Sequence, residues 1–450
     1  MIRQKGSTEM TKTTSSTTGY RSPSPEVGVA ERYTSPEYLG LEYERLWPYV
    51  WQLACHVDEV PHSGDYLEYE VGRESILIVR LTDGRLKAFH NACQHRGMRL
   101  KTGCGNATEL RCRSHAWCWN LDGSLKEVTD PQDFDPAAID PSRIGLPEVQ
   151  VDTWAGLVFV NMDGAAPPLR DFLGVVPEKV AHFRMGEMKL LSKVTTKIAC
   201  NWKLAHEAFI ETYHAIGTHP QALRYVDDTS LEYEQHGIHG MHRFGPQAMG
   251  TPSKRLDADD LDRGDVLLAA VAELASANLY SDEDVAAMRA LVPVVNALPE
   301  DASMTEFFAN LRREEAIANG IDLSAYSDRD IALGPLWNLF PNITIPCNAG
   351  NILVFRWRPD GQNPESCYWD KYELKFVGEG REAPEPSFVQ VDDWRDYEHW
   401  GVVLEQDLTN LPIWQLGVRT RGFSGPIWGR PDGNVANMHR VLGEYLAKER

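Results

Sequence analysis

The sequence contains no long apolar segment. No run of about 18 apolar residues, the length that spans a bilayer, occurs in the 450 residues. Residues 1–27 are rich in Ser and Thr and lack the apolar block of a signal peptide. We therefore expect no membrane partner and no export signal, and we predict that residues 1–40 form a disordered or extended arm.

Cysteine and positive charge are also scarce. The 8 cysteines show no disulfide pattern, which favours a reducing, cytoplasmic location. The 45 Lys and Arg residues are outnumbered by 65 Asp and Glu residues, so the formal net charge is −20. This charge argues against nucleic acid and anionic membranes as partners, because both would be repelled at long range.

Two cysteine–histidine pairs carry the strongest signal. Cys93 and His95 form a Cys-x-His pair, and Cys112 and His115 form a Cys-x2-His pair. Small zinc domains usually group cysteine with cysteine and histidine with histidine. A Rieske [2Fe–2S] centre instead takes two cysteines on one iron and two histidines on the other. The mixed order therefore favours a [2Fe–2S] cluster bound by these four residues.

Short strand-like runs dominate residues 48–163. Ser75–Leu81 and Arg85–His90 flank an Asp-Gly turn, which is a hairpin signal. The pair Pro167-Pro168 resists both helix and central strand and marks a boundary. We predict an N-terminal all-β domain over residues 41–165, with the metal-ligand pairs on its loops, and a second domain over residues 166–450.

The second domain mixes helical and strand patterns, so the fold class is α+β. Residues 200–216 have apolar residues at helical spacing, and Gly217 and Pro220 would end this helix. Residues 257–324 predict an acidic helical excursion, which we expect to be a solvated cover or a subunit contact. Strand-like runs follow at 337–346, 351–357 and 368–376, and helical runs at 396–417 and 435–448.

A second metal site is predicted near the end of the helix over residues 200–216. His214 and His219 form a His-x4-His pair, which is weak evidence alone because the chain has 14 histidines. Glu211 lies three residues before His214 on the same predicted helical face, so its carboxylate can reach an imidazole. An iron that activates O₂ takes two histidines and one carboxylate and leaves other positions open.

The third ligand is predicted to be Asp407. It lies within an apolar stripe of the helical run at 396–417. The stripe consists of Val403, Leu404, Leu411 and Trp414. An acid on an apolar stripe is costly without a partner, and a metal explains it. Glu405 and the acidic residues at 392–398 are expected to be solvated.

A third set of histidines, His236, His239 and His242, recurs every third residue. No acid or cysteine accompanies the set, and the neighbouring residues give no clean helical pattern. We therefore predict a structural or pocket-lining role rather than a metal site.

These motifs resemble the catalytic alpha subunits of Rieske non-haem iron aromatic ring-hydroxylating oxygenases, over about residues 42–445. The matching residues are Cys93, His95, Cys112 and His115 for the Rieske pair, Asn201-Trp-Lys, Glu207, Glu211, His214 and His219 for the mononuclear iron motif, and Gln406-Asp407 with Gln415 for the third ligand. Many members have Asp where this chain has Glu211, and Asn where it has Ala208.

The resemblance implies a Rieske [2Fe–2S] domain followed by a helix-grip catalytic domain, in which a curved antiparallel sheet lies under a long helix. It also implies a trimer, either a homotrimer or an alpha3beta3 assembly with a small beta subunit. In that assembly Glu211 would link the cluster ligand His115 of one subunit to His214 of the next.

The implied activity is that of a terminal oxygenase. Electrons from NAD(P)H would arrive through a reductase and a ferredoxin, and O₂ would hydroxylate an apolar aromatic or polycyclic substrate, by cis-dihydroxylation. The alternatives are monooxygenation or oxidative O- or N-dealkylation at the same iron. More remote alternatives are a Rieske electron-transfer protein and a ligand-binding module with a structural zinc.

Overall fold

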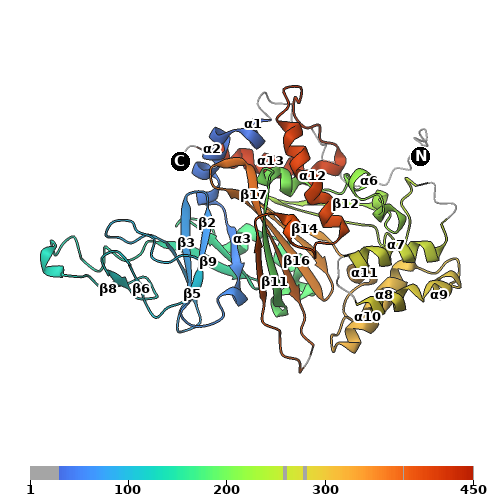
Figure 1. Ribbon diagram of the computed structural model, residues 1–450, viewed down its shortest axis with the longest axis horizontal. Helices are drawn as coiled ribbons and strands as arrows, with labels where there is room; N and C mark the ends of the chain where they lie inside the picture. Colours follow the sequence, from blue (N-terminus) through green and yellow to red (C-terminus); the bar gives the residue numbers. More distant parts are fainter. Residues whose placement is uncertain (1–29, 257–260, 277–280, 379, 449–450) are drawn as a thin grey trace.

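The computed structural model describes residues 30–256, 261–276, 281–378 and 380–448. Figure 1 shows three parts in a row: a β region at one end, a large sheet with covering helices in the centre, and a helical part at the other end. The structure is therefore α+β, as predicted. Among the described residues, no helix is long and apolar enough to cross a membrane.

The described chain begins with two short helices, α1 (Glu31–Thr34) and α2 (Pro36–Arg45). Ser35 caps α2 by accepting a hydrogen bond from the Tyr38 N–H, and Pro36 occupies the first helical turn. The prediction of a disordered or extended arm is therefore wrong for residues 31–40. The rest of the predicted arm, residues 1–29, lies outside the described residues.

The β region contains a seven-stranded sheet in the order β1-β10-β9-β4-β3-β2-β5. Its strands are β1 (Gln52–His56), β2 (Asp65–Val71), β3 (Glu74–Arg80), β4 (Leu86–His90), β5 (Cys104–Asn106), β9 (Glu148–Trp154) and β10 (Leu157–Asn161). A smaller sheet consists of β6 (Leu110–Arg111), β7 (Cys118–Trp119) and β8 (Leu125–Glu127). The predicted hairpin is confirmed as β3 and β4, which pair antiparallel.

The central sheet has eight strands in the order β12-β13-β14-β15-β16-β17-β11-β18. They are β11 (Lys189–Ile198), β12 (Glu232–His236), β13 (His239–Arg243), β14 (Leu336–Leu339), β15 (Ile343–Asn348), β16 (Asn351–Asp360), β17 (Asn363–Lys375) and β18 (Ser387–Val391). All neighbouring strands are antiparallel except β11 and β18. Phe355 and Trp357 on β16 join one buried core, while Ile352 and Val354 join the core on the opposite face.

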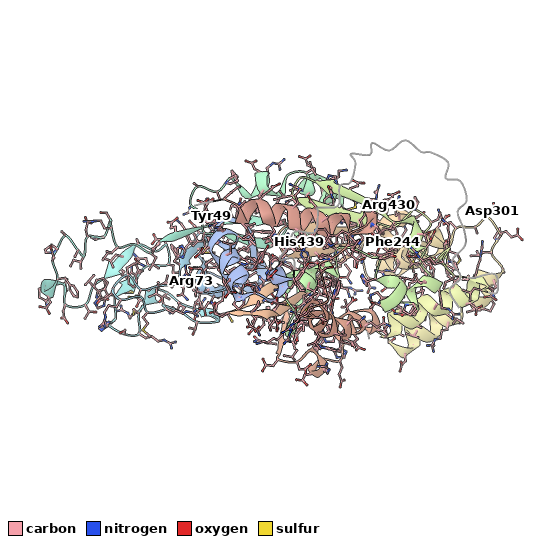
Figure 2. The ribbon with its side chains drawn as sticks, turned by 90° about the horizontal axis from the view of Figure 1, so that it is seen from above. Tyr49, Arg73, Phe244, Asp301, Arg430 and His439 are labelled. Carbon is pink, nitrogen blue, oxygen red and sulfur yellow. The ribbon has the colours of Figure 1, made fainter. Side chains whose placement is uncertain are left out.

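Helices cover the sheet and form the excursion. Those near the sheet are α3 (Leu169–Leu173), α4 (Val176–Val180), α5 (Trp202–Glu207), α6 (Ala215–Thr218), α12 (Val402–Val418) and α13 (Gly433–Leu446). In Figure 2, α13 extends across the molecule between Arg430 and Tyr49, with His439 on it. The predicted single helix over residues 200–216 is wrong: α5 ends at Glu207, and α6 begins only at Ala215.

The acidic excursion is helical, as predicted. It contains α7 (Arg263–Ser276), α8 (Asp282–Arg289), α9 (Val292–Asn296), α10 (Met304–Ala318) and α11 (Asp328–Leu333). Ser281 caps α8 by accepting from the Asp284 N–H, and Asp284 reaches back to the Ser281 N–H. Figure 2 shows that this part, marked by Asp301, projects from the end of the molecule opposite the β region.

Candidate metal centres

The predicted cluster ligands lie on two loops with the same backbone pattern. In the first loop the Cys93 N–H donates to the Met98 carbonyl, and the Gly97 N–H donates back to the Cys93 carbonyl, both at 2.8 Å. The second loop repeats these bonds between Cys112 and Trp117, at 2.8 Å, and between Ala116 and Cys112, at 3.1 Å. Both turns need a positive φ at the fourth residue after the cysteine, 78° at Gly97 and 61° at Ala116.

The two loops bring their side chains together. The rings of His95 and His115 have centroids 4.6 Å apart, and His95 stacks on Trp117 at 4.7 Å. Cys93 and Cys112 are buried, whereas His115 is exposed. Residues of both loops line a cavity of about 250 Å³, including both cysteines and His115. Cys93, Cys112 and His115 therefore line one space, and the ring of His95 packs against that of His115.

His95 tests whether these residues fit a cluster. Its Nδ1 atom is buried and makes no hydrogen bond to any described residue, which is costly for a polar atom. Burial and the positive charges of His115 and Arg96 lower the pKa of His95, so the neutral imidazole, the form that binds metals, is favoured. The orphaned nitrogen and the two buried thiols fit the ligand set of a [2Fe–2S] cluster.

The predicted ligands of the second site also lie close together. His214, His219 and Asp407 place one ligand atom each within 4.8 Å of one another. The two Nε2 atoms lie 3.2 Å apart, and Asp407 Oδ1 lies 3.1 Å from His219 Nε2 and 3.6 Å from His214 Nε2. Among the described residues this is the one such group. Two imidazoles and one carboxylate thus converge on one point. This is the ligand set of an octahedral iron that keeps its other positions open.

Each of the two histidines has a side-chain hydrogen-bond partner at its Nδ1 atom. His214 Nδ1 lies 2.6 Å from Glu211 Oε1, and His219 Nδ1 lies 2.8 Å from Gln406 Oε1. An acceptor at Nδ1 keeps the proton there and leaves the lone pair on Nε2, which faces the other ligands. Burial lowers the pKa of His214, but its hydrogen bond to Glu211 and the charges of Glu211 and Asp407 outweigh this effect and raise the pKa overall.

Glu211 reaches His214 through a turn and not along a helix. Its Oε2 accepts hydrogen bonds from the backbone N–H groups of Tyr213 and His214, the latter at 3.2 Å. These bonds take the place of the intrahelical bonds that Tyr213 and His214 would make in a continuous helix. The predicted contact is therefore present, although the helical face that predicted it is not.

Asp407 lies on α12, as the apolar stripe predicted. The buried residues of this helix are Asp407, Leu408, Leu411, Gln415 and Val418. Trp414, which was expected in the stripe, is 40% exposed, because the buried face turns toward Gln415. Glu405 is exposed, as predicted.

The third histidine set is not helical. His236 ends β12, and His239 and His242 lie on β13 of the same hairpin. His239 bonds the Phe172 carbonyl at 2.8 Å and the Phe340 N–H at 3.1 Å, so both ring nitrogens serve the backbone. Burial lowers the pKa of His239 to about 4 and that of His242 to about 3. These contacts support the predicted structural role of His239.

The sequence motif includes two buried polar residues of α5, Glu207 and Lys203, but sequence reasoning missed their partners. Glu207 Oε1 accepts from Tyr33 Oη at 2.9 Å and contacts His439 Nε2 at 2.8 Å. Lys203 Nζ donates to Glu42 Oε1 at 2.6 Å, and both side chains are almost fully buried. These pairs tie α5 to the two ends of the described chain, and no local pattern could have predicted them.

Within one subunit the two sites lie far apart in the fold. Figure 1 shows β6, which leads into the second cysteine loop, at one end of the molecule, whereas α12 lies over the central sheet and α6 lies on the side away from the β region. The two sites therefore do not face each other in a single chain.

Two family models match the chain. The Rieske [2Fe–2S] domain matches residues 50–143, and the ring hydroxylating alpha subunit (catalytic domain) matches residues 185–448. Solved structures show the same fold over nearly the whole chain. A quaternary ammonium Rieske monooxygenase in complex with L-carnitine has a TM-score of 0.64, with 19% identity and coverage of 94% and 97% of the two chains. Naphthalene 1,2-dioxygenase from Rhodococcus sp. has a TM-score of 0.62, with 18% identity and coverage of 94% and 95%.

Curated relatives are more similar in sequence. The large subunit of anthranilate 1,2-dioxygenase from Acinetobacter baylyi is 35% identical over 196 residues, 42% of this chain and 41% of the relative. The oxygenase subunit of carnitine monooxygenase from Escherichia coli is 32% identical over 214 residues, 47% of this chain and 56% of the relative.

A third relative is the oxygenase subunit of glycine betaine monooxygenase from Chromohalobacter salexigens, 34% identical over 205 residues, 45% of this chain and 44% of the relative. The chain spans about half the length of the curated relatives it matches. The matched catalytic model alone covers more than half of the chain. The chain therefore belongs to the Rieske non-haem iron ring-hydroxylating oxygenase family, as an alpha subunit with a Rieske domain and a catalytic domain.

Proposed function

We propose that this enzyme is a terminal oxygenase in which Cys93, His95, Cys112 and His115 hold the Rieske cluster, and His214, His219 and Asp407 hold the mononuclear iron. The family carries both cofactors, and the cluster supplies single electrons while the iron activates O₂. The convergence of two Nε2 atoms and one carboxylate oxygen, with both Nδ1 atoms held from behind, carries this assignment. We also propose that the domains divide near residue 165, between the end of β10 and the start of α3.

Glu211 is proposed to connect neighbouring subunits. Its Oε1 holds His214 Nδ1, and the adjacent Tyr213 is 55% exposed, so this turn lies at the molecular surface. The exposed His115 lies on the loop after β6, which is at the far end of the molecule from α6, so it can reach such a turn only on another subunit. Head-to-tail contacts of this kind form closed rings, and three subunits would complete one, with or without a small beta subunit.

The electron donor is proposed to be a ferredoxin or a reductase that draws on NAD(P)H. The family match over residues 185–448 supports an oxygenase rather than a pure electron-transfer protein or a module with a structural zinc. The cytoplasmic location predicted from cysteine usage stays a prediction.

The charge around the iron site bears on the substrate. Among the described residues, Glu211 and Asp407 form ion pairs with histidines and with no Lys or Arg. The Fe(II) proposed at this site would balance these two carboxylate charges, so the charge of the site suits a neutral substrate, and the site offers no Lys or Arg partner for a carboxylate. An apolar aromatic or polycyclic compound, hydroxylated to a cis-dihydrodiol, remains our first candidate.

A second candidate is monooxygenation or oxidative dealkylation of a quaternary ammonium compound. The names of the carnitine and glycine betaine relatives favour it.

Product analysis under ¹⁸O₂ distinguishes the two candidates. The full chain, with a reductase and ferredoxin supplying electrons, would be given neutral aromatic compounds and methylated quaternary amines in parallel. Two labelled oxygens in an aromatic product support dihydroxylation, and one labelled oxygen with an ammonium substrate supports the second candidate. If neither panel consumed O₂ in a substrate-dependent way, both substrate assignments would be wrong.

A further inference from the structure

The two iron-site histidines are oriented by chemically different partners. The Nδ1 atom of His214 faces the Glu211 carboxylate, which only accepts hydrogen bonds when ionised. The Nδ1 atom of His219 faces Gln406, whose amide can accept through Oε1 or donate through Nε2. A donating Gln406 would leave the His219 proton on Nε2, where it blocks metal binding. Something else must therefore fix the direction of this amide.

The partner of Gln406 cannot fix it. Gln221 and Gln406 form a reciprocal amide pair, with Gln221 Nε2 donating to Gln406 Oε1 at 2.8 Å and Gln406 Nε2 donating to Gln221 Oε1 at 3.2 Å. If both amides flipped together, the same two hydrogen bonds would form again. The pair is therefore satisfied in either direction, and only a group outside it can choose between the two.

Glu273, on α7 of the excursion, occupies the required place. Helix α7 packs against the turn at Ala222–Arg224, directly after Gln221, and against α12. It also caps α12, because Ser276 Oγ accepts from the Val402 N–H at 3.1 Å, whereas Gly401 supplies no side chain.

The Glu273 carboxylate is largely buried. Its Oε2 makes no hydrogen bond to any described residue, and burial raises its pKa. A hydrogen bond from the Gln221 side chain, the charge of His219 and the Val403 N–H oppose that rise. The carboxylate thus lies beside the Gln221 amide.

We propose that Glu273 is a positioning residue: as an obligate acceptor it holds the Gln221 amide nitrogen toward itself, which turns Gln406 Oε1 toward His219 and leaves His219 Nε2 free for iron. The inference rests on the proposed iron site. It gives the acidic excursion a role in the chemistry, which the sequence alone did not indicate. Through the same chain, the carboxylate also strengthens His219 as a donor to the metal.

Moving the carboxylate from position 273 to position 406 tests the inference. Glu273→Gln is isosteric but can donate as well as accept, so the amide pair loses its fixed direction. The double variant Glu273→Gln/Gln406→Glu keeps the net charge and places a carboxylate directly behind His219, as Glu211 stands behind His214. Glu405→Gln is the matched control, because this exposed residue precedes Gln406 on α12.

The measurement is the Fe(II) affinity of the full-length protein. The mononuclear iron is removed with a chelator, Fe(II) is returned anaerobically against a chromogenic chelator, and the Rieske absorption reports that each variant is folded. Loss of direction alone costs about twofold, since half of the molecules would hold the wrong tautomer. His219 would also become a weaker donor to the metal. We therefore expect Glu273→Gln to bind Fe(II) about 10-fold more weakly, which is the low end of the losses seen when a hydrogen-bond partner of a ligating histidine is changed.

The double variant should return to within about twofold of the wild type, and Glu405→Gln should not differ from it. If Glu273→Gln bound Fe(II) as tightly as the wild type, or if the double variant lost as much Fe(II) affinity as Glu273→Gln, the proposed role of Glu273 would be wrong. The proposed iron site would not be affected by either result. If Glu273→Gln did not fold, the single Gln406→Glu variant should still bind Fe(II) at least as tightly as the wild type, and weaker binding would overturn the inference. If the wild type bound Fe(II) no better than Asp407→Ala, the proposed iron site itself would be wrong.

Discussion

Lys203 and Glu42 form an ion pair that joins α5, just before the iron-site turn, to α2 near the start of the described chain. Their side chains are 1% and 0% exposed, and Nζ lies 2.6 Å from Oε1. Trp202 Nε1 donates to the other carboxylate oxygen at 2.9 Å. Replacement of Lys203 by methionine keeps the apolar stem but leaves the Glu42 charge buried with one hydrogen bond.

The expected loss of stability follows from this burial. Removing one partner of a buried ion pair costs about 3–5 kcal/mol, and the remaining bond from Trp202 puts the value near the lower limit. At about 2–4 °C per kcal/mol for a unit of this size, a loss of about 3 kcal/mol lowers Tm by roughly 6–12 °C. The Rieske absorption should be unchanged, because the cluster loops lie elsewhere.

Thermal unfolding followed by tryptophan fluorescence measures the effect. Lys179→Met is the control, since Lys179 is 51% exposed and lies 3.8 Å from Glu234, so its loss should cost less than about 1 kcal/mol. The double variant Glu42→Gln/Lys203→Met removes the buried charge and should recover most of the lost Tm. A Lys203→Met variant as stable as the control, or a double variant no better than the single one, would refute the reasoning.

Three further changes have defined outcomes. Asp407→Ala should lose the mononuclear iron and all turnover while it keeps the Rieske absorption; iron retained at that site would place the third ligand elsewhere. Glu211→Gln should keep both metals but slow electron transfer from the reduced cluster by more than 10-fold, on the order of the losses seen for groups behind metal ligands. An unchanged single-turnover rate would remove Glu211 from the path. Cys112→Ser should abolish the Rieske absorption, and a persisting spectrum would reassign the cluster ligand.

The parts of the site that the sequence predicted are those with a local pattern. Cys93, His95, Cys112 and His115 are close in sequence, and each pair lies on one loop. Asp407 stood out because an acid interrupted an apolar stripe, and the helix α12 does bury it. Local spacing was sufficient here because each signal lies within one element or one loop.

The contact between Glu211 and His214 shows the limit of helical reasoning. Three-residue spacing predicted the pair, yet α5 ends at Glu207, and the Glu211 carboxylate accepts from the backbone N–H groups of Tyr213 and His214 in a turn. The spacing was correct for a turn as well as for a helix. Periodicity alone does not separate the two when a carboxylate can bond the backbone.

The remaining supports could not be predicted from local patterns. Tyr33 and His439 reach Glu207 from positions 174 and 232 residues away. Glu273 lies in an acidic helical segment, where most carboxylates are solvated, and tertiary packing of α7 against its neighbours partly buries it. The contacts of these residues depend on tertiary packing. No pattern within their own sequence segments indicates them.

Metal and sulfide analysis of the purified chain tests the two-centre assignment most directly. A Rieske cluster and one mononuclear iron predict about three iron atoms for two acid-labile sulfides per chain, falling to about two and two in Asp407→Ala. Zinc without labile sulfide, or an unchanged iron content in Asp407→Ala, would contradict the account.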